Sequence, residues 1–226
     1  IEEAITSSQL EGAVTTREVA KKMLREDRRP SNRSERMIVN NFKTMGHILN
    51  LKDQPLTKEL VFDIHRELSE GTLDIQDGAG RFRRKNEDIN VSDIDGTVFH
   101  KPPPSDELES RMEAMCDFAN GKTTEGFLHP VIRAIILHFW LAYDHPFVDG
   151  NGRTARALFY RQMLHSDYWM FEFISISQFL RKAPTRYAMA FLHSETDEND
   201  LTYFLIHQIE VIKRALKELH DYVARK

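Results

Sequence analysis

A buried helix, a polar loop and a second helix follow one another directly, and this succession constrains the fold more than any other feature. Residues 130–143 are apolar on nearly every side, which indicates a helix in the middle of the fold. A His-Pro pair ends this segment, and the next helix is expected to begin at Asn151 or Gly152 and to continue through Met163. The sequence therefore predicts a central helix–loop–helix unit.

The rest of the hydrophobic pattern is also mostly helical. Apolar residues recur at spacings of three and four, which marks one face of a helix, in four further segments: 38–49, 60–68, 108–119 and 205–223. Ser34, Thr57 and Ser105 precede three of these segments as candidate N-terminal caps. The sequence predicts an all-α protein.

One segment departs from the helical pattern. A short alternating run is followed by an Asp-Gly pair, a strong turn signal because both central residues of such a turn favour positive φ. A second alternating run returns from the turn, and three consecutive prolines then stop the pairing. We therefore predict a small β-hairpin over about 88–100, leaning on the helical body. Its strands carry Ile89, Asn90 and Val91, then Thr97 and Val98.

The composition narrows the classes of protein to which the chain can belong. Its 226 residues are enough to bury a sizeable core as one domain. A net charge of −4 gives no basic field of the kind that nucleic-acid-binding proteins carry. The single Cys116 rules out an internal disulfide, the acidic start lacks the features of a signal peptide, and the longest apolar run, 131–141, is too short to span a bilayer. We expect a cytoplasmic protein that contacts neither membrane nor nucleic acid through this chain.

A charged and polar stretch divides the chain near its beginning. Residues 25–36 contain Pro30 and several helix breakers, which is typical of a solvated connector. We interpret residues 1–30 as an N-terminal helix with its connector. Residues 31–226 are then the main domain, which holds both the predicted hairpin and the central loop.

The central loop reads HPFVDGNGRTAR and combines groups that suit a phosphate chain. Gly150, Asn151 and Gly152 lie at a helix N-terminus, where free backbone N–H groups and the helix dipole favour an anion. Arg153 and Arg156 are three residues apart and share a face of the helix. Their positive charge opposes the helix dipole unless an anion is bound. The pattern predicts a site for a diphosphate.

Two more side chains of this motif, residues 145–156, suit chemistry on a phosphate. Asp149 offers a hard oxygen ligand beside the predicted anion site, and Mg²⁺ usually takes one or two carboxylates with phosphate oxygens and water. His145 has an ordinary pKa of about 6.5 and can accept a proton near neutral pH. The motif therefore predicts a metal ligand and a general base next to each other.

The motif resembles the signature of the Fic family, His-x-Phe-x-Asp/Glu-Gly-Asn-Gly-Arg-x-x-Arg, at every fixed position. The chain from about Thr57 to Asp221 looks like a full Fic core, and the predicted hairpin resembles the Fic flap. Fic proteins are mainly α-helical, and most transfer AMP from ATP to a hydroxyl of a target protein with release of pyrophosphate. The resemblance implies ATP as substrate, Mg²⁺ as cofactor, and a Ser, Thr or Tyr hydroxyl of a target protein as acceptor.

The same resemblance implies a role for each residue of the motif. His145 would deprotonate the target hydroxyl, and Asp149 would hold Mg²⁺ on the α- and β-phosphates. The hairpin would bind an extended segment of the target through backbone hydrogen bonds. The residues implied to bind the nucleotide are Gly150, Asn151, Gly152, Arg153 and Arg156, the last of them at the γ-phosphate.

A short N-terminal motif resembles the inhibitory motif of the family, Ser/Thr-x-x-x-Glu-Gly/Asn. It comprises Ser7, Glu11 and Gly12, and the first two share a helix face because they are four residues apart. A glutamate offered to Arg156 would form a charge-assisted pair and would take the space that a γ-phosphate needs. The resemblance therefore implies an N-terminal inhibitory helix in which Glu11 restrains AMP transfer.

Several alternatives stay open on the sequence alone. The same fold can remove AMP from a modified target, or transfer another nucleotide or phosphocholine. Gly152 argues against a kinase-like branch of the family, which has lysine there, and His145 argues against a module that binds nucleotide without turnover. A homodimer and a further C-terminal winged-helix domain are also open.

Overall fold

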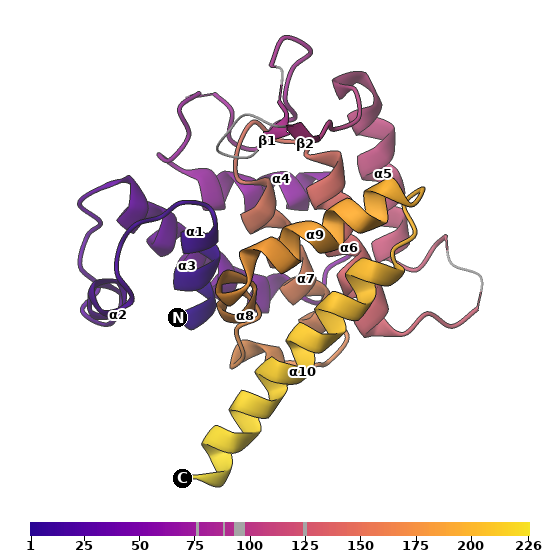
Figure 1. The fold of residues 1–226 in the computed structure, drawn as a ribbon. Helices are drawn as coiled ribbons and strands as arrows, with labels where there is room; N and C mark the ends of the chain where they lie inside the picture. Colours follow the sequence, from indigo (N-terminus) through magenta and orange to yellow (C-terminus); the bar gives the residue numbers. More distant parts are fainter. Residues whose placement is uncertain (76, 88, 93–97, 124–125) are drawn as a thin grey trace.

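A computed structural model describes residues 1–75, 77–87, 89–92, 98–123 and 126–226. In this part the chain is mainly helical, with one pair of short strands (Figure 1). The longer helices are α1 (Glu2–Leu10), α2 (Arg17–Arg25), α3 (Arg33–Leu51), α4 (Lys58–Ser69), α5 (Leu108–Ala119), α6 (Pro130–Asp144), α7 (Asn151–His165), α9 (Pro184–Thr196) and α10 (Thr202–Ala224). The short elements are β1 (Val91–Ser92), β2 (Val98–His100), the 3₁₀ turns η1 (Ser105–Glu107) and η2 (Trp169–Glu172), and α8 (Ser177–Lys182).

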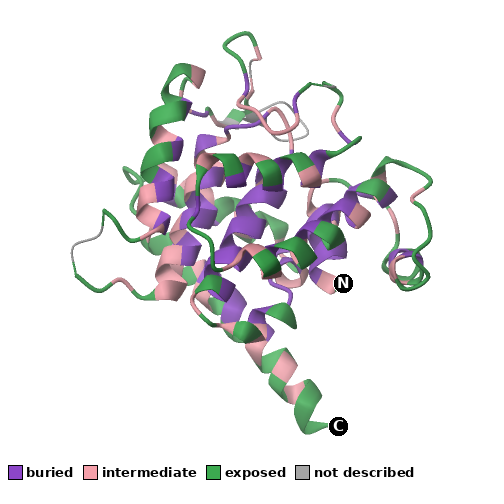
Figure 2. Ribbon diagram, turned by 180° about the vertical axis from the view of Figure 1, so that it is seen from behind, coloured by how far each residue is buried: buried purple, intermediate pink, exposed green. Residues whose placement is uncertain are grey.

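The predicted central unit is formed by α6 and α7, which pack along each other with α3, α4, α5 and α10 around them (Figure 1). Pro130 occupies the first turn of α6, where a missing N–H costs nothing. Leu137 of α6 and Phe159 of α7 are both fully buried. Nearly the whole length of α7 is buried (Figure 2). The loop between the two helices is therefore held by the core of the protein.

The predicted helix starts are right in one case and wrong in two. Thr57 caps α4, because its hydroxyl accepts a hydrogen bond from the Leu60 amide at 3.2 Å. Ser34 does not cap α3; Asn32 does, by accepting from the amide three residues on at 2.9 Å. Ser105 makes no side-chain cap either, because a 3₁₀ turn occupies residues 105–107 before α5 begins. Several capping residues near one helix start leave the exact boundary undecided.

The N-terminal helix α1 is part of the folded body. It packs against α3 and α8 (Figure 1), although its sequence is largely polar. Ile5 is fully buried in a small core cluster with Met37 and Ile38 of α3. Ser8 is buried as well and donates to the carbonyls of Ala4 and Met37 at 2.8 and 3.2 Å. Satisfied polar groups therefore allow a polar helix to be buried.

Strands β1 and β2 pair antiparallel, with Val91 opposite His100 and Ser92 opposite Val98. The predicted Asp-Gly turn and Thr97 lie outside the described residues. The complete hairpin over 88–100 therefore stays a prediction. No helix in the described part of the chain is long and apolar enough to cross a membrane.

Candidate active site

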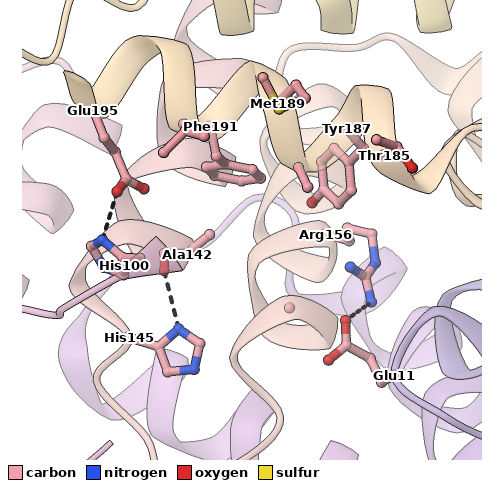
Figure 3. A pocket seen from close by; sticks show the side chains of 13 residues that line it. Glu11, His100, Ala142, His145, Arg156, Thr185, Tyr187, Met189, Phe191 and Glu195 are labelled. Carbon is pink, nitrogen blue, oxygen red and sulfur yellow. Dashed lines mark hydrogen bonds and ion pairs between the residues drawn. The ribbon is translucent and has the colours of Figure 1, made fainter. Parts of the chain in front are cut away.

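A cavity of about 360 Å³ opens beside the loop that joins α6 to α7 (Figure 3). Its walls come from parts of the chain that are far apart in sequence. His145 and Gly152 contribute from the central loop and the start of α7, and Arg156 lies one turn further along α7. The cavity is also lined by Glu11 at the end of α1 and, from α9, by the side chains of Tyr187, Met189, Phe191 and Glu195.

His145 is presented to the cavity by an unusual backbone conformation. It follows the last residue of α6 with a left-handed φ of 45°, which is uncommon for a residue other than glycine. Its Nδ1 lies 3.2 Å from the Ala142 carbonyl, which can only accept, so Nδ1 carries the proton and Nε2 keeps its lone pair. Burial lowers the pKa of His145 to about 4. The ring is therefore neutral near pH 7, with its basic nitrogen available.

The backbone around His145 is held from the segment before the hairpin. Arg83 donates from Nε to the His145 carbonyl at 2.9 Å, and its own amide donates to the Pro146 carbonyl at 2.8 Å. One contact from the buried guanidinium and one from the backbone of the same residue fix the position of the loop. No pattern in the sequence pointed to this arginine.

The side chain of Asn151 organises the loop itself. Its Oδ1 accepts from the Phe147 amide at 2.9 Å, and its Nδ2 donates to the Phe147 carbonyl at 2.8 Å. Asn151 is 2% exposed, so its side chain does not face the cavity. Phe147 is fully buried beneath the loop. Of the groups expected at the anion site, Asn151 thus offers only its backbone N–H.

A second histidine, His65 of α4, supports the loop from below. Its ring stacks on Phe147, with centroids 3.7 Å apart and planes within 4°. Nδ1 accepts from the Gly80 amide and Nε2 donates to the Asp149 carbonyl, both at 2.9 Å, which fixes the neutral tautomer. Burial lowers the pKa of His65 to about 4. Its place on the apolar stripe of α4, four residues after Val61, was the signal in the sequence that could have found it.

Positions 150 and 152 of the motif need glycine for different structural reasons. Gly150 has a left-handed φ of 84° at the residue before α7, a conformation that favours glycine. Gly152 lies directly under the carboxylate of Glu11: a Cβ there would be 2.2 Å from Glu11 Oε1. The carboxylate of Glu11 therefore occupies the N-terminal end of α7, where the sequence predicted an anion.

The two arginines of the motif point to different neighbours. Arg156 lines the cavity and donates to Glu11 Oε1 from Nη2 at 2.8 Å. Arg153 instead donates from Nη1 to the Leu68 carbonyl at 2.8 Å and is 1% exposed. Its Nε and Nη2 make no hydrogen bond with the described residues, and burial lowers its pKa. Among the described residues, Arg153 thus keeps two donors without a hydrogen bond next to the loop, with Nη2 3.9 Å from Asp149 Oδ1.

The predicted inhibitory residues meet Arg156 in the structure. Arg156 donates from Nε to the Ser7 hydroxyl at 2.8 Å and from Nη2 to the Ser7 carbonyl at 3.0 Å. Burial would raise the pKa of Glu11, but the charge and hydrogen bond of Arg156, together with the charge of Arg153, outweigh it and lower that pKa, so Glu11 is ionised. Gly12 follows with a φ of 89° and lets the chain turn away from the site.

Asp149 lies at the surface beside the start of α7 and does not line the cavity. Its side chain is 43% exposed, and its carboxylate accepts from the Gly150 amide and from Arg33 Nη2, the latter at 3.4 Å. In the described residues, no three His, Cys, Asp or Glu side chains cluster as a metal site. A lone exposed carboxylate beside an anion site still fits Mg²⁺ that takes its other ligands from phosphate and water.

The residues predicted to dock a target are only partly described. Val98 of β2 is 51% exposed, and Ile89 and Asn90 precede β1. Thr97 lies outside the described residues, and the side chain of Val91 is not described. Target docking by this segment stays a prediction.

Comparison with known proteins matches the part of the chain that contains the central loop. Residues 55–163 match the sequence model of the Fic/DOC family. The protein adenylyltransferase Fic of Nematostella vectensis is 37% identical over 116 residues, which cover 51% of this chain and 25% of that protein. The chain thus spans about a quarter of the length of this curated relative.

The fold is shared along almost the whole chain. A Fic family protein from Desulfovibrio desulfuricans G20 superimposes with a TM-score of 0.76 at 21% identity, covering 98% of this chain and 65% of that one. A Fic domain-containing signalling protein from Bacteroides thetaiotaomicron VPI-5482 gives a TM-score of 0.78 at 22% identity, covering 96% and 83%. These likenesses show the fold, including the helices outside the matched residues.

Proposed function

The chain is a Fic/DOC family protein, and from this premise we propose that it is a protein adenylyltransferase. It transfers AMP from ATP to a Ser, Thr or Tyr hydroxyl of a target protein, and Glu11 restrains the reaction. One observation carries the proposal: a neutral His145 and the carboxylate of Glu11, paired with Arg156 over the start of α7, share one cavity. A base and an anion site at the two ends of a cavity suit transfer from a phosphate.

The reaction assigns a role to each end of the cavity. His145 Nε2 takes the proton of the target hydroxyl as its oxygen attacks the α-phosphorus, and the bond to pyrophosphate breaks in line. The start of α7 and Arg156 hold the departing phosphates, which carry the developing charge. Arg153 supplies its unused donors when the loop binds phosphate oxygens. Transfers of this kind depend mostly on positioning and electrostatic stabilisation.

Asp149 is the residue that would bind Mg²⁺ in this proposal. Its carboxylate is the acidic group of the motif, and its exposure leaves room for water and phosphate ligands. Bound there, the ion would offset the negative charge of the phosphates. Asp149 would then give up its contact with Arg33 to hold the ion, while the backbone carbonyl of Asp149 is held by His65.

Glu11 acts as a brake because it holds the place of a phosphate. Its carboxylate carries the same sign of charge, lies on Gly152, and uses the guanidinium of Arg156. ATP can place its terminal phosphate there only if this carboxylate moves. The hairpin segment and a target protein complete the proposal, with an extended target chain pairing alongside β1 or β2.

The variant His145→Ala tests the assignment of the base. We expect it to lose AMP transfer by about 10²- to 10⁴-fold, the usual contribution of a general base. ATP affinity, measured by calorimetry, should change little because His145 lies away from Arg156. Retained transfer in this variant would remove His145 from the reaction, whereas lost ATP binding would make it a binding residue.

A further inference from the structure

A second charged pair lies in the cavity wall away from Arg156, between His100 of β2 and Glu195 of α9 (Figure 3). His100 Nδ1 is 2.8 Å from Glu195 Oε2, and His100 Nε2 is 2.6 Å from the Tyr143 carbonyl of α6. The two side chains are only 9% and 14% exposed. Neither residue has a role in the proposed reaction, yet three separate elements meet at this ring.

Both ring nitrogens of His100 face oxygens that accept hydrogen bonds. An ionised carboxylate and a backbone carbonyl have no proton to give. A neutral imidazole carries one N–H, so it would set a lone pair against one of these oxygens at hydrogen-bond distance. The geometry therefore calls for an imidazolium that donates from both nitrogens.

The charges around the ring favour this state. Burial alone would lower the pKa of His100, but Glu195, the Tyr143 carbonyl and Asp144 outweigh it and raise the pKa above its usual value. Arg111 of α5 is the nearby positive group: it pairs with Asp144 at 2.7 Å and so reduces that part of the effect. The acidic groups from α6 and α9 therefore outweigh the basic group from α5.

The ring is also linked to the catalytic side of the cavity. The positive charge of His100 is one of the causes that lower the pKa of His145. Because His145 is neutral, the two rings do not repel each other. The tyrosine whose carbonyl holds His100 lies two residues before His145. A change at His100 is therefore expected to affect both the wall of the cavity and the end of α6.

We propose that His100, as an imidazolium, is a positioning residue that fixes strand β2 to α6 and α9 and so sets the shape of the nucleotide cavity. Without the second proton, the ring keeps at most one of its two contacts, and β2 separates from one helix. The inference depends on the proposed function only in taking ATP as the ligand. Its first test requires no nucleotide.

That first test is the titration of His100 by NMR with labelled histidine. We expect a pKa above the usual 6.5, with both nitrogens protonated at pH 6, and a lower pKa in Glu195→Gln because the negative charge is gone. A His100 pKa at or below 6.5 in the unmodified protein, or a neutral tautomer at pH 6, would overturn the proposal.

The second test is ATP affinity, measured by calorimetry at pH 6. His100→Gln retains a polar side chain but not the charge, and we expect it to weaken ATP binding about tenfold, the low end for a hydrogen bond to a charged group. His47→Gln is the matched control, because His47 pairs with Glu67 at the exposed surface; its affinity should stay within about twofold. Equal ATP affinity in His100→Gln and the parent contradicts the positioning role.

A pH series separates positioning from general loss of structure. ATP affinity of the parent should fall as the pH rises through the His100 pKa, because the positive form is the one that holds β2. In Glu195→Gln the midpoint should move to lower pH, which mere destabilisation would not produce. An unmoved midpoint contradicts the proposal.

Failure of the proposed function has a different signature. If the parent binds no ATP, the adenylyltransferase proposal fails, and amide hydrogen exchange of residues 98–101 then decides about His100. Faster exchange in His100→Gln than in His47→Gln supports the positioning role, and equal exchange contradicts it.

Discussion

The two ends of α1 hold their glutamates in different ways. Glu3, near the start of the helix, is 7% exposed and has no basic partner among its hydrogen bonds in the described residues. It accepts from the Tyr160 hydroxyl at 2.9 Å, the Ser175 hydroxyl at 2.8 Å and the Ser177 amide at 3.0 Å. These neutral donors come from α7, from the segment before α8 and from the first residue of α8. The start of α1 is therefore built into the body.

Glu11, just beyond the other end of α1, depends on one partner. Its carboxylate is 25% exposed and receives a hydrogen bond from Arg156 alone among the described residues. The next residue, Gly12, has open space around its Cα. The difference teaches that one helix can combine a fixed anchor with a releasable group. We therefore expect Glu11 to leave Arg156 by a side-chain rotation while Glu3 keeps α1 docked.

The largest expected effect is on stability, at the anchored end. Glu3→Ala leaves several buried donors without an acceptor, so we expect the free energy of unfolding to fall by about 3–5 kcal/mol. Glu2→Ala is the matched control: Glu2 pairs with Arg17 and Lys21 near the surface, and its loss should cost less than about 1 kcal/mol. Urea unfolding measures both. Similar losses of unfolding free energy in the two variants would contradict the anchoring role of Glu3.

A smaller effect is expected where Glu11 rests on α7. Gly152→Ala sets a Cβ against the Glu11 carboxylate, so Glu11 must leave Arg156, and stability should fall by about 1–2 kcal/mol. In a Glu11→Gly background the same substitution should be neutral or stabilising, because alanine favours a helix. A double-mutant cycle in urea measures the coupling. Additive effects would mean that Glu11 does not rest on this residue.

The smallest effect concerns the pH dependence of His145. Because its pKa is about 4, the neutral ring contributes stability above pH of about 6.5 that is lost as the pH falls toward 4. At saturating ATP, the rate of transfer by Glu11→Gly should change less than about twofold between pH 6 and 8, since the base stays neutral throughout. The negative charge of Glu11 raises the His145 pKa, so removing it should lower that pKa further. An acid limb centred near pH 6.5 in kcat/KM would contradict this.

The sequence predicted those parts of the molecule that local pattern controls. Helical spacing and Pro130 gave α6, and the motif of residues 145–156 is contiguous, so its loop and the following helix could be read directly. Glu11 was expected opposite Arg156 through a family resemblance, and the structure brings Glu11 and also Ser7 of the same motif to this arginine. The helix and the loop follow from local chemistry, whereas the pairing of Glu11 with Arg156, 145 positions away, came from the resemblance alone.

The contacts that the sequence did not predict join residues far apart in the chain. His65 contacts the backbone of Asp149, 84 positions away, and His100 contacts Glu195, 95 positions away. No spacing rule predicts such pairs, because packing of helices brings them together. Asn32 and Ser34 show a local limit, since both types cap helices and only the backbone geometry selects one.

The central claim is that Glu11 restrains transfer of AMP from ATP by the cavity that holds His145. The most direct measurement compares Glu11→Gly with the parent after incubation with Mg²⁺ and ATP labelled at either the α- or the γ-phosphorus. We predict at least about tenfold more protein-bound label from α-labelled ATP in Glu11→Gly, from loss of a charge-assisted hydrogen bond. No label should come from γ-labelled ATP, and none should appear in Glu11→Gly/His145→Ala. Label from the γ-phosphorus, or equal α-label in Glu11→Gly and the parent, would contradict the account.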